Sequence, residues 1–270
     1  MTNSIRSEGS VGENLGSRSF EMKSFKKVFA ATPLHPGSGP LLAFKQTLLA
    51  LQPQAPAKKN GKQEIMPSFV VSGPAADVAK HVADLKYFIT DSPASAARGL
   101  SVFEKTVVFA DQHSAIKALP SIVDASKNNE NFLFICYNTE EYSLAPMIRA
   151  AYVATACTAY PEDYIAKVKK AMLEAGGLKF IEILCPDPKS GFDASNAIEV
   201  GRLAVESSLW PLYEFTDQQL TLTKRPIRLE PLDRYTSIQK KFENYSMEQI
   251  AAWQEKVNKR WKLLLDGRLV

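Results

Sequence analysis

Residues Thr106 to Tyr142 contain the feature that most constrains the fold: two apolar runs joined by a segment of helical length. The first run, TVVFAD, ends in Asp111, and the second, FLFICYN, ends in Asn138. Runs rich in Val, Ile and Phe predict buried strands, and a helix-length connection predicts that they are parallel. In parallel sheets, ligands bind in the crevice beyond the carboxyl ends of the strands. If the chain binds a phosphate or a metal ion, the sequence therefore predicts that the site lies at Asp111 and residues 138–140.

The size, charge and cysteine pattern of the chain narrow its class. A chain of 270 residues with 45% hydrophobic content can bury a full core, as one large α/β domain or one domain with appendages. A net charge of +4, mixed in sign along the chain, argues against a nucleic-acid partner. Cys136, Cys157 and Cys185 form no CxxC pair, which predicts buried, reduced thiols. No segment is apolar enough for a membrane span or a signal core, so a cytoplasmic location is expected.

The region before the central unit begins with a polar arm. Residues 1–23 are rich in Ser, Gly, Asn and charged side chains, which predicts a flexible N-terminal arm. Leucines at near-helical spacing predict a helix ending near Leu51. The turn before it contains Gly37 and Gly39 but no Lys, so a plain turn is favoured over an anion-binding loop. The polar, Lys-rich segment Pro53–Glu64 predicts an exposed connector.

Three further elements are predicted between this connector and Thr106. Residues Ser68–Val71 predict a short strand. The spacing over residues 75–88 predicts an amphipathic helix whose apolar face contains Val78, Val82, Leu85 and Phe88. His81 lies beside that face, where a lone histidine is more often packed or at the surface than a ligand. The small residues of segment 92–103 predict a closely packed helix.

The region after the central unit continues the alternation. Residues 145–160 suit either a closely packed helix or an extended segment next to a site. Residues 161–177 predict a helix, because a proline and two acidic residues begin it and two glycines end it. Residues 179–185, KFIEILC, predict a third strand. Residues 194–210 predict an amphipathic helix with inward positions at Ile198, Leu203 and Val205.

The last part of the chain predicts an extension of the fold. Alternating apolar and polar residues around Asp217–Gln219 predict a hairpin or an extended arm. Ser246 and Gln249 have the spacing of a capping box at the start of a helix. The apolar face of this helix, more often core or subunit contact than a cofactor site, contains Ile250, Trp253, Val257, Trp261 and Leu264. The order of elements predicts an α/β fold: a mostly parallel sheet flanked by helices, with a C-terminal helical extension.

Three stretches of the sequence resemble one known family. FLFICYNTEEY, KFIEILCPDP and IEVGRLAVESSLWPLYEF are similar to the β subunit of pyruvate (or other 2-oxoacid):ferredoxin oxidoreductases. The resemblance runs from about Ser24 to Gly267 and is closest to members whose substrates include pyruvate. It implies a thiamine diphosphate-binding fold over residues 24–215 and a C-terminal arm and helix over residues 216–270.

The resemblance also assigns a cofactor site. In this family, the Asp of a Gly-Asp-Gly turn binds Mg²⁺, and an Asn in an Asp-Asn-Glu turn after the next strand supplies a second oxygen ligand. A diphosphate needs such a hard cation with oxygen ligands. By this resemblance, Asp111 takes the place of the metal Asp, Thr139 takes the place of the Asn, and Glu140 is kept. The implied cofactor-binding residues are Asp111, Thr139 and Glu140, and the implied Mg²⁺ ligands are Asp111 and Thr139.

The surroundings of Asp111 depart from the family pattern. The turn reads Ala110-Asp111-Gln112-His113, so both glycines are replaced, and two side chains stand where the cofactor would lie. The cofactor-lining stretch that follows is shortened to SLAPM, residues 143–147. Losing even supporting contacts costs roughly 10–100-fold in metal affinity. The sequence therefore predicts that thiamine diphosphate and Mg²⁺ are not usefully bound.

The cysteine ligands of a second cofactor of this family are also replaced. Some members hold a 4Fe–4S cluster through four cysteine thiolates. Here His35 and Ser38 replace a cysteine pair, and the SGPAAD stretch at residues 72–77 contains no cysteine. In CPDP, Asp187 stands at the matching position, with Cys185 two residues earlier. Four departures together predict that no cluster is bound.

Three functions are compatible with these residues. The first is a β-type subunit of a pyruvate-like 2-oxoacid:ferredoxin oxidoreductase complex that is structural or regulatory and not catalytic by itself. The second is an active subunit in which Asp111 and Thr139 support oxidative decarboxylation of a 2-oxoacid to acyl-CoA. Both predict α-type (and γ/δ-type) subunits as partners, with ferredoxin reached indirectly. The third is a metal or small-anion site at His113, Asp111, Glu140 and Glu141, for which an ordinary polar loop is the favoured alternative. Whether the chain is itself an enzyme, and which 2-oxoacid is involved, stays open.

Overall fold

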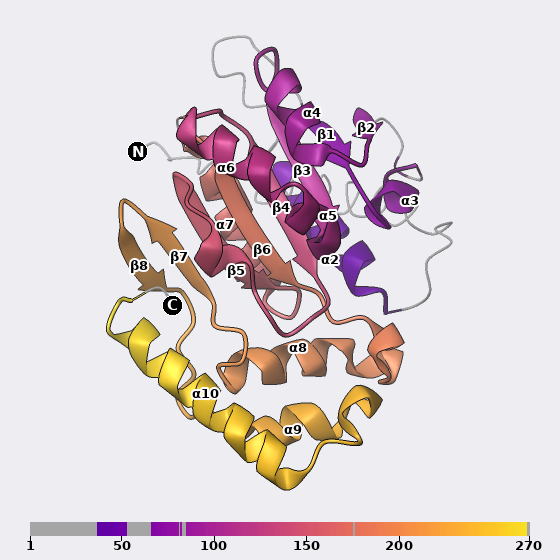
Figure 1. Ribbon diagram of the computed structural model, residues 1–270. Helices are drawn as coiled ribbons and strands as arrows, with labels where there is room; N and C mark the ends of the chain where they lie inside the picture. The colour runs from indigo at the N-terminus through magenta and orange to yellow at the C-terminus, as the bar shows by residue number, and fades with distance from the viewer. Residues whose placement is uncertain (1–36, 53–65, 81, 83–84, 175, 269–270) are drawn as a thin grey trace, which may run out of the picture.

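The computed structural model describes residues 37–52, 66–80, 82, 85–174 and 176–268. The predicted arm over residues 1–23, the connector Pro53–Glu64, His35 and His81 lie outside these residues. Within the described part, helices cover both faces of a central sheet, and further helices lie beyond one end of it (Figure 1).

The described strands form one eight-stranded sheet in the order β2-β1-β3-β4-β6-β5-β7-β8. The strands are β1 (Ser68–Val71), β2 (Tyr87–Ile89), β3 (Thr106–Asp111), β4 (Leu133–Asn138), β5 (Tyr152–Cys157), β6 (Lys179–Leu184), β7 (Tyr213–Thr216) and β8 (Gln219–Leu222). Strands β1 to β6 pair in parallel, and the hairpin β7–β8 adds two antiparallel strands at one edge. The predicted α/β fold with a mostly parallel sheet is confirmed.

The central strands are apolar because both of their faces are covered. Every residue of β4, β5 and β6 is buried. Strands β3 and β4 pair in parallel with Val107 opposite Leu133 and Asp111 opposite Tyr137, so the predicted βαβ unit is confirmed. The same register brings Asp111 and Asn138 to one end of the sheet.

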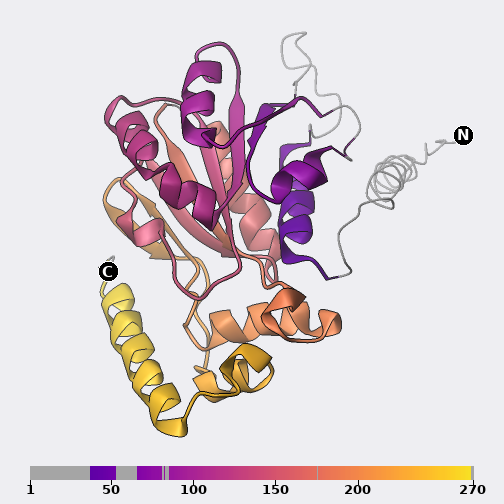
Figure 2. The same ribbon diagram turned by 45° about the vertical axis from the view of Figure 1, so that its right-hand side comes forward.

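Two groups of helices cover the two faces. The helices are α2 (Gly39–Leu51), α3 (Ala75–Ala79), α4 (Pro93–Leu100), α5 (Gln112–Lys117), α6 (Leu119–Lys127), α7 (Pro161–Leu173), α8 (Ala197–Glu206), α9 (Leu232–Ser237) and α10 (Met247–Leu265). Helices α2, α3 and α7 pack on one face of the sheet, where Phe44 and Tyr164 join the core around Phe109. Helices α4 to α6 pack on the other face, around Val108 and Phe134 (Figures 1 and 2).

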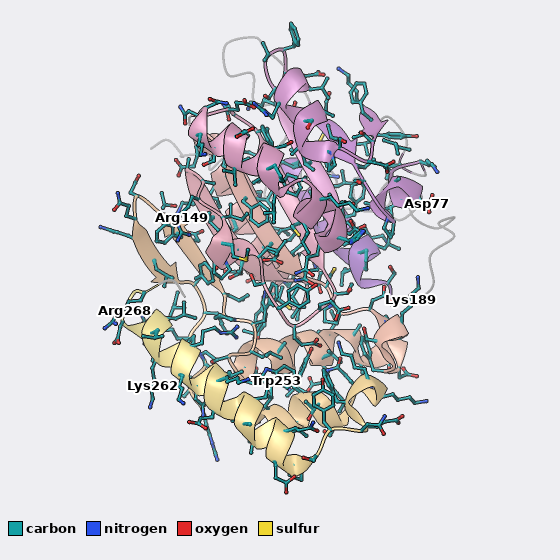
Figure 3. All side chains as sticks on the ribbon, in the orientation of Figure 1. Asp77, Arg149, Lys189, Trp253, Lys262 and Arg268 are labelled. Atoms are coloured by element: carbon teal, nitrogen blue, oxygen red, sulfur yellow. The ribbon has the colours of Figure 1, made fainter. Side chains whose placement is uncertain are left out.

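A third core lies beyond the carboxyl ends of β5 and β6. There α8, α9 and α10 bury Val200, Trp210, Tyr235 and Val257 together with the last residues of these strands. Trp253 lies on the side of α10 that faces α9, whereas Lys262 points away from the body of the molecule (Figure 3). None of the helices in the described residues is long and apolar enough to cross a membrane.

Short 3₁₀ turns occur in the connections: η1 (Ala145–Met147), η2 (Pro188–Ser190), η3 (Ala194–Asn196) and η4 (Lys240–Phe242). The hairpin predicted around Asp217–Gln219 is confirmed. Its two-residue turn has φ of 51° at Asp217 and 63° at Gln218, as a primed turn requires. The predicted capping box is also present, with both reciprocal hydrogen bonds between Ser246 and Gln249.

Two predictions about this part of the fold are wrong. The helix predicted over residues 75–88 ends at Ala79, and Tyr87–Ile89 instead form the edge strand β2. Aromatic and β-branched side chains suit a strand, and pairing with β1 outweighs the helical spacing. Ile198 is 48% exposed, because it lies opposite the buried stripe of α8, whereas Leu203 and Val205 are buried as predicted.

The ambiguous segment 145–160 contains the turn η1 and the buried strand β5. Helix α9 was not predicted, although Leu232, Tyr235 and Thr236 bury one face at helical spacing. The three cysteines are free and buried, as predicted. Strand β7 crosses the domain boundary predicted after residue 215, and that division stays a prediction.

Candidate functional site

The candidate residues meet in a crevice at the carboxyl ends of β3 and β4. Asp111, Thr139 and Glu140 line this crevice, which has a volume of about 230 Å³, together with His113 and Tyr142. Parallel pairing of β3 and β4 brings the two strand ends side by side. Their predicted placement is therefore confirmed, while their role as cofactor or metal ligands stays a prediction.

Asp111 has a structural role in the described fold. It ends β3 and is the N-cap of α5, where its Oδ1 accepts a hydrogen bond of 2.8 Å from Ser114 N. On its other side the backbone of Gly73 comes close, since a Cβ added there would lie 2.7 Å from Asp111 Oδ2. Gly73 also has a φ of +64°, which favours glycine. The carboxylate is thus held between the loop after β1 and the first turn of α5.

Gln112 is buried beneath the loop that follows β4. Its Nε2 donates to the carbonyl oxygen of Tyr142 at 2.9 Å and to Glu182 Oε1 at 3.3 Å. The neighbouring His113 is exposed and lines the crevice. Helix α5 begins at Gln112, so no glycine-like turn separates the strand from the helix.

Asn138 shapes the turn at the end of β4. Its Oδ1 accepts from Glu140 N at 2.7 Å, and its Nδ2 donates to the Tyr142 carbonyl oxygen at 2.7 Å and to Glu182 at 2.9 Å. The side chain is buried. Asn138 therefore helps to set the position of Glu140 and is itself one of the residues that line the crevice.

Glu182 on β6 joins these segments, and no sequence pattern assigned it to the site. Its carboxylate accepts hydrogen bonds from Ser143 Oγ (2.5 Å), Leu144 N (2.7 Å), Ala145 N (2.9 Å), Asn138 Nδ2 (2.9 Å) and Gln112 Nε2 (3.3 Å). Burial raises the pKa of Glu182 above its ordinary value, and the hydrogen bonds oppose that shift. One sequence feature could have identified Glu182: it is the only acid in the apolar run KFIEIL. A buried carboxylate needs hydrogen-bond partners, so such a residue indicates a polar network around it.

Glu141 faces the C-terminal part of the chain. Its carboxylate accepts a 2.8 Å hydrogen bond from Tyr235 Oη and forms an ion pair with Lys241. It does not join His113, Asp111 and Glu140 in the crevice lining. Within the described residues, no group of three or more His, Cys, Asp or Glu side chains is arranged to hold a metal ion.

The loops that would hold an iron–sulfur cluster lie against each other. A Cβ added to Gly39 would be 2.2 Å from the carbonyl oxygen of Cys185, so the start of α2 packs directly on the Cys-Pro loop. Ser38 is the residue before α2, and Asp187 caps η2 by accepting from Lys189 N at 3.0 Å. Burial raises the pKa of the Cys185 thiol well above its ordinary value.

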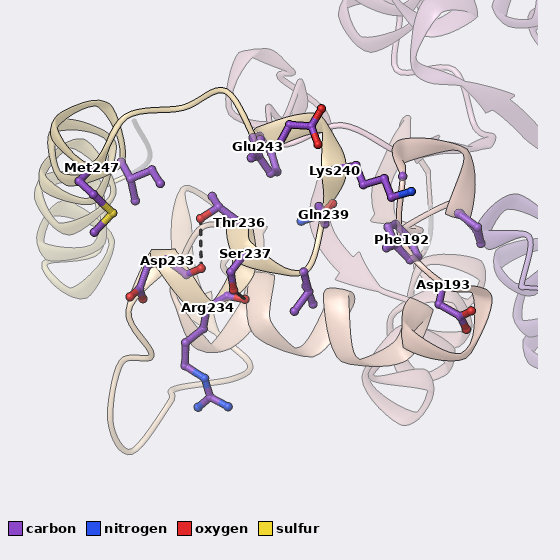
Figure 4. A pocket seen from close by; sticks show the side chains of 15 residues that line it. Phe192, Asp193, Asp233, Arg234, Thr236, Ser237, Gln239, Lys240, Glu243 and Met247 are labelled. Atoms are coloured by element: carbon purple, nitrogen blue, oxygen red, sulfur yellow. Dashed lines mark hydrogen bonds between the residues drawn. The ribbon is translucent and has the colours of Figure 1, made fainter.

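A larger pocket of about 940 Å³ lies between the loop after β6 and helices α9 and α10 (Figure 4). Its polar groups take part in local turns. Asp193 accepts from Ser195 N at 2.8 Å, and Thr236 Oγ1 donates to the Asp233 carbonyl oxygen at 3.1 Å. Sequence patterns did not indicate this pocket. The crevice is the better candidate because its polar side chains come from neighbouring strand ends.

Comparison with known proteins places these features in context. No protein-family model matches the chain. The chain is 32% identical over 200 residues to pyruvate synthase subunit PorB of Methanothermobacter marburgensis, covering 60% of this chain and 69% of that subunit. It is 42% identical over 123 residues to PorB of Methanocaldococcus jannaschii, covering 44% of this chain and 41% of that subunit. The matched part thus spans less than half of the length of the second relative.

Two other oxidoreductases are also similar. Ketoisovalerate oxidoreductase subunit VorB of Pyrococcus horikoshii is 34% identical over 120 residues, covering 43% of this chain and 38% of that subunit. A solved structure of 2-oxoglutarate:ferredoxin oxidoreductase from Magnetococcus marinus superposes with a TM-score of 0.44 at 15% identity, covering 63% of this chain and 77% of that chain.

Proposed function

The chain belongs to the PorB family of 2-oxoacid:ferredoxin oxidoreductase β subunits, and from this premise we propose that it is a structural or regulatory β-type subunit of such a complex, not catalytic by itself. Its partners in this proposal are α-type and γ/δ-type subunits, with ferredoxin reached through them in the cytoplasm. A pyruvate-like 2-oxoacid is the substrate proposed for the complex, because several similar relatives are pyruvate synthase subunits.

The observation that carries the proposal is the engagement of Asp111. One carboxylate oxygen caps α5 through Ser114 N, and the backbone of Gly73 lies against the other. A magnesium-bridged diphosphate needs open oxygen ligands and backbone N–H groups that can approach the phosphates. Here the flanking positions are Ala110, buried within β3, and Gln112, whose amide bonds to Tyr142 and Glu182. These residues do not fit a magnesium-bridged diphosphate.

Cofactor binding tests the proposal directly. The purified chain, alone and with its α-type partner, is titrated with thiamine diphosphate and Mg²⁺ in a calorimeter. No heat of binding is expected at micromolar concentrations. A β-type subunit that carries the Gly-Asp-Gly turn serves as the positive control. Micromolar affinity for this chain in either form would overturn the proposal.

One observation favours an active subunit as the second candidate. Asp111, Thr139 and Glu140 still line a single crevice at paired strand ends. Under this alternative, Asp111 and Thr139 would hold Mg²⁺, and the bound cofactor would supply the chemistry of 2-oxoacid decarboxylation.

Two substitutions separate the second candidate from the first. Asp111→Ser keeps a good N-cap residue but removes the carboxylate, so it should abolish turnover of the assembled complex only if Asp111 binds the metal. The matched control is Asp77→Ala, since Asp77 is an exposed acid on α3 outside the crevice. Turnover that is unchanged in Asp111→Ser would exclude the active-subunit alternative.

A further inference from the structure

A small cavity separates the C-terminal helix from the loop beneath the crevice. It has a volume of about 20 Å³ and is lined by side chains from α10, from the start of β7 and from the loop after β4. Arg260, Tyr213 and Ser143 are among its polar lining residues. Leu264, Trp210 and other apolar side chains complete its wall, so bulk water has little access to these polar groups.

Two of the polar groups around this cavity lack a protein partner. Tyr213 Oη and Arg260 Nε are both buried, and neither forms a hydrogen bond to any described residue. Tyr213 is only 2% exposed. The other end of the guanidinium is engaged, since Arg260 Nη2 donates to the carbonyl oxygens of Ser208 and Leu209. Buried donors of this kind are costly unless something in the cavity accepts from them.

The opposite wall of the cavity offers an acceptor. Ser143 Oγ donates to Glu182 Oε2 at 2.5 Å and accepts from Ala145 N at 3.2 Å, so the hydroxyl oxygen keeps one lone pair that can accept a further hydrogen bond. Thr155, also on the wall, is already satisfied, because its Oγ1 donates to Pro211 O at 2.6 Å and accepts from Tyr213 N at 3.1 Å. The cavity therefore presents two unused donors and one acceptor.

From this arrangement we propose that the cavity binds one ordered water molecule, which accepts from Arg260 Nε–H and Tyr213 Oη–H and donates to Ser143 Oγ. The volume is that of one water, for which roughly 10–15 Å³ is the minimum, and the partners fall within the usual range of two to four. Burial, and then the Glu182 carboxylate, raise the pKa of Tyr213, so its hydroxyl stays a donor at neutral pH. A chloride ion would accept from the same donors but could not donate to Ser143.

The water completes a path of hydrogen bonds between α10 and the crevice. It runs from Arg260 through the water to Ser143, and from there to Glu182, which bonds Leu144 N and Ala145 N. The conformation of the loop after β4 thus depends on Arg260 of the C-terminal helix, which acts on that loop through the water. This inference is independent of whether the crevice binds a cofactor.

A high-resolution crystal structure of the full chain gives the first test. We expect electron density for one water within hydrogen-bond distance of Tyr213 Oη and Arg260 Nε. In crystals grown with bromide in place of chloride, no anomalous signal is expected at this position. An empty cavity, or a bromide peak, would overturn the proposal.

A double-mutant cycle gives the second test. Arg260→Met and Ser143→Ala are made singly and together, and the equilibrium constant for unfolding is measured in urea. Coupling through the water predicts that the double variant departs from additivity by roughly threefold or more. The matched control pairs Ser143→Ala with Lys259→Met, since Lys259 is an exposed neighbour on α10, and this pair should be additive. Additivity in both cycles would contradict the proposed link.

Hydrogen exchange distinguishes this link from a general loss of stability. In Arg260→Met, the amides of Leu144 and Ala145 should exchange several-fold faster under native conditions, whereas the core amides of β4 should exchange as in the parent chain. Lys259→Met should change neither group. Unchanged exchange at Leu144 and Ala145 in Arg260→Met would overturn the proposed path.

Discussion

Two buried titratable side chains organise different regions of this molecule, and their partners differ in kind. Lys167, on α7, donates to Asp163 Oδ2 at 2.6 Å, to Thr155 O at 2.8 Å and to Thr223 Oγ1 at 2.7 Å. Glu182, on β6, accepts hydrogen bonds from neutral donors among the described residues, including the backbone N–H groups of Leu144 and Ala145.

The difference reflects where the partners come from. The carboxylate partner of Lys167 lies one turn away on the same helix. The other two acceptors, Thr155 O and Thr223 Oγ1, lie on β5 and just after β8, so Lys167 connects α7 to these two segments. The donors to Glu182 come from α5, from the end of β4 and from the loop after it, which together shape the crevice. A change at Lys167 should therefore affect stability, whereas a change at Glu182 should also affect the site. Four predictions test this comparison.

The largest effect is expected from Glu182→Ala. This change leaves several buried donors unpaired at once, which should lower the free energy of unfolding by about 4 kcal/mol. Urea denaturation of the purified chain measures the loss. A loss below about 1 kcal/mol would mean that the donors find other partners, and Glu182 would then not be the residue that unites the crevice segments.

Lys167→Met should have a smaller effect, about 2 kcal/mol. The Asp163 side chain is 19% exposed and can be hydrated when the ammonium group is removed, so less desolvation cost remains than at Glu182. Lys169→Met on the same helix serves as the control and should change stability little. If Lys167→Met proved as costly as Glu182→Ala, the contrast between an ion pair and neutral donors would not hold.

The pH dependence of stability should distinguish the two groups by sign. Burial raises the pKa of Glu182 in the folded state above its value of 4.5 in the unfolded chain. Its contribution to the free energy of unfolding is therefore fully present below pH 4.5 and is lost as pH rises through the folded-state pKa. Burial instead lowers the pKa of Lys167, so its contribution is present above 10.5 and is lost as pH falls through the folded pKa.

The measurement compares the parent chain with Glu182→Gln and Lys167→Met in urea across these pH ranges. The stability of the parent relative to Glu182→Gln should fall as pH rises above 4.5. Relative to Lys167→Met, it should rise as pH approaches 10.5 from below. A rise in the first comparison would mean that the hydrogen bonds to Glu182 outweigh its desolvation.

The smallest effect is expected at Asp111, which lies in the crevice but outside the Glu182 network. Asp111→Ala removes the N-cap of α5 and should cost about 1 kcal/mol, whereas Asp111→Ser should cost only a few tenths. Thermal denaturation of both variants checks this order. Equal losses would indicate that the carboxylate has a role at Gly73 beyond capping.

The sequence predicted the parts of the fold whose signals are local. Strands β3, β4 and β6 are nearly continuous apolar runs because both faces of the sheet are covered. The capping box and the hairpin turn each depend on residues within four positions of one another. The edge strand β2 has only three residues, which is too few to show a strand pattern in the sequence. The residues before it have helical spacing, so the sequence predicted a helix where pairing with β1 forms a strand.

The site was predicted only in its position. Strand order and the polar ends of β3 and β4 located the crevice, because parallel strands end on one side of the sheet. The partners of Glu182 come from segments 37 to 70 residues away in sequence, and no spacing rule connects them. The N-cap role of Asp111 was also not predicted, because Asp111 was interpreted as a metal ligand on the basis of the family resemblance alone.

The contact between Glu141 and Tyr235 has a consequence for how the protein is made. The two residues are 94 positions apart, so the turn that carries Thr139 and Glu140 is synthesised long before its C-terminal partner. At ~5–20 residues per second, the ribosome adds Tyr235 roughly 5–20 seconds after Glu141. The sheet can form during that interval from nearer contacts, whereas the crevice turn acquires its hydrogen bond to Tyr235 only after that residue has been synthesised.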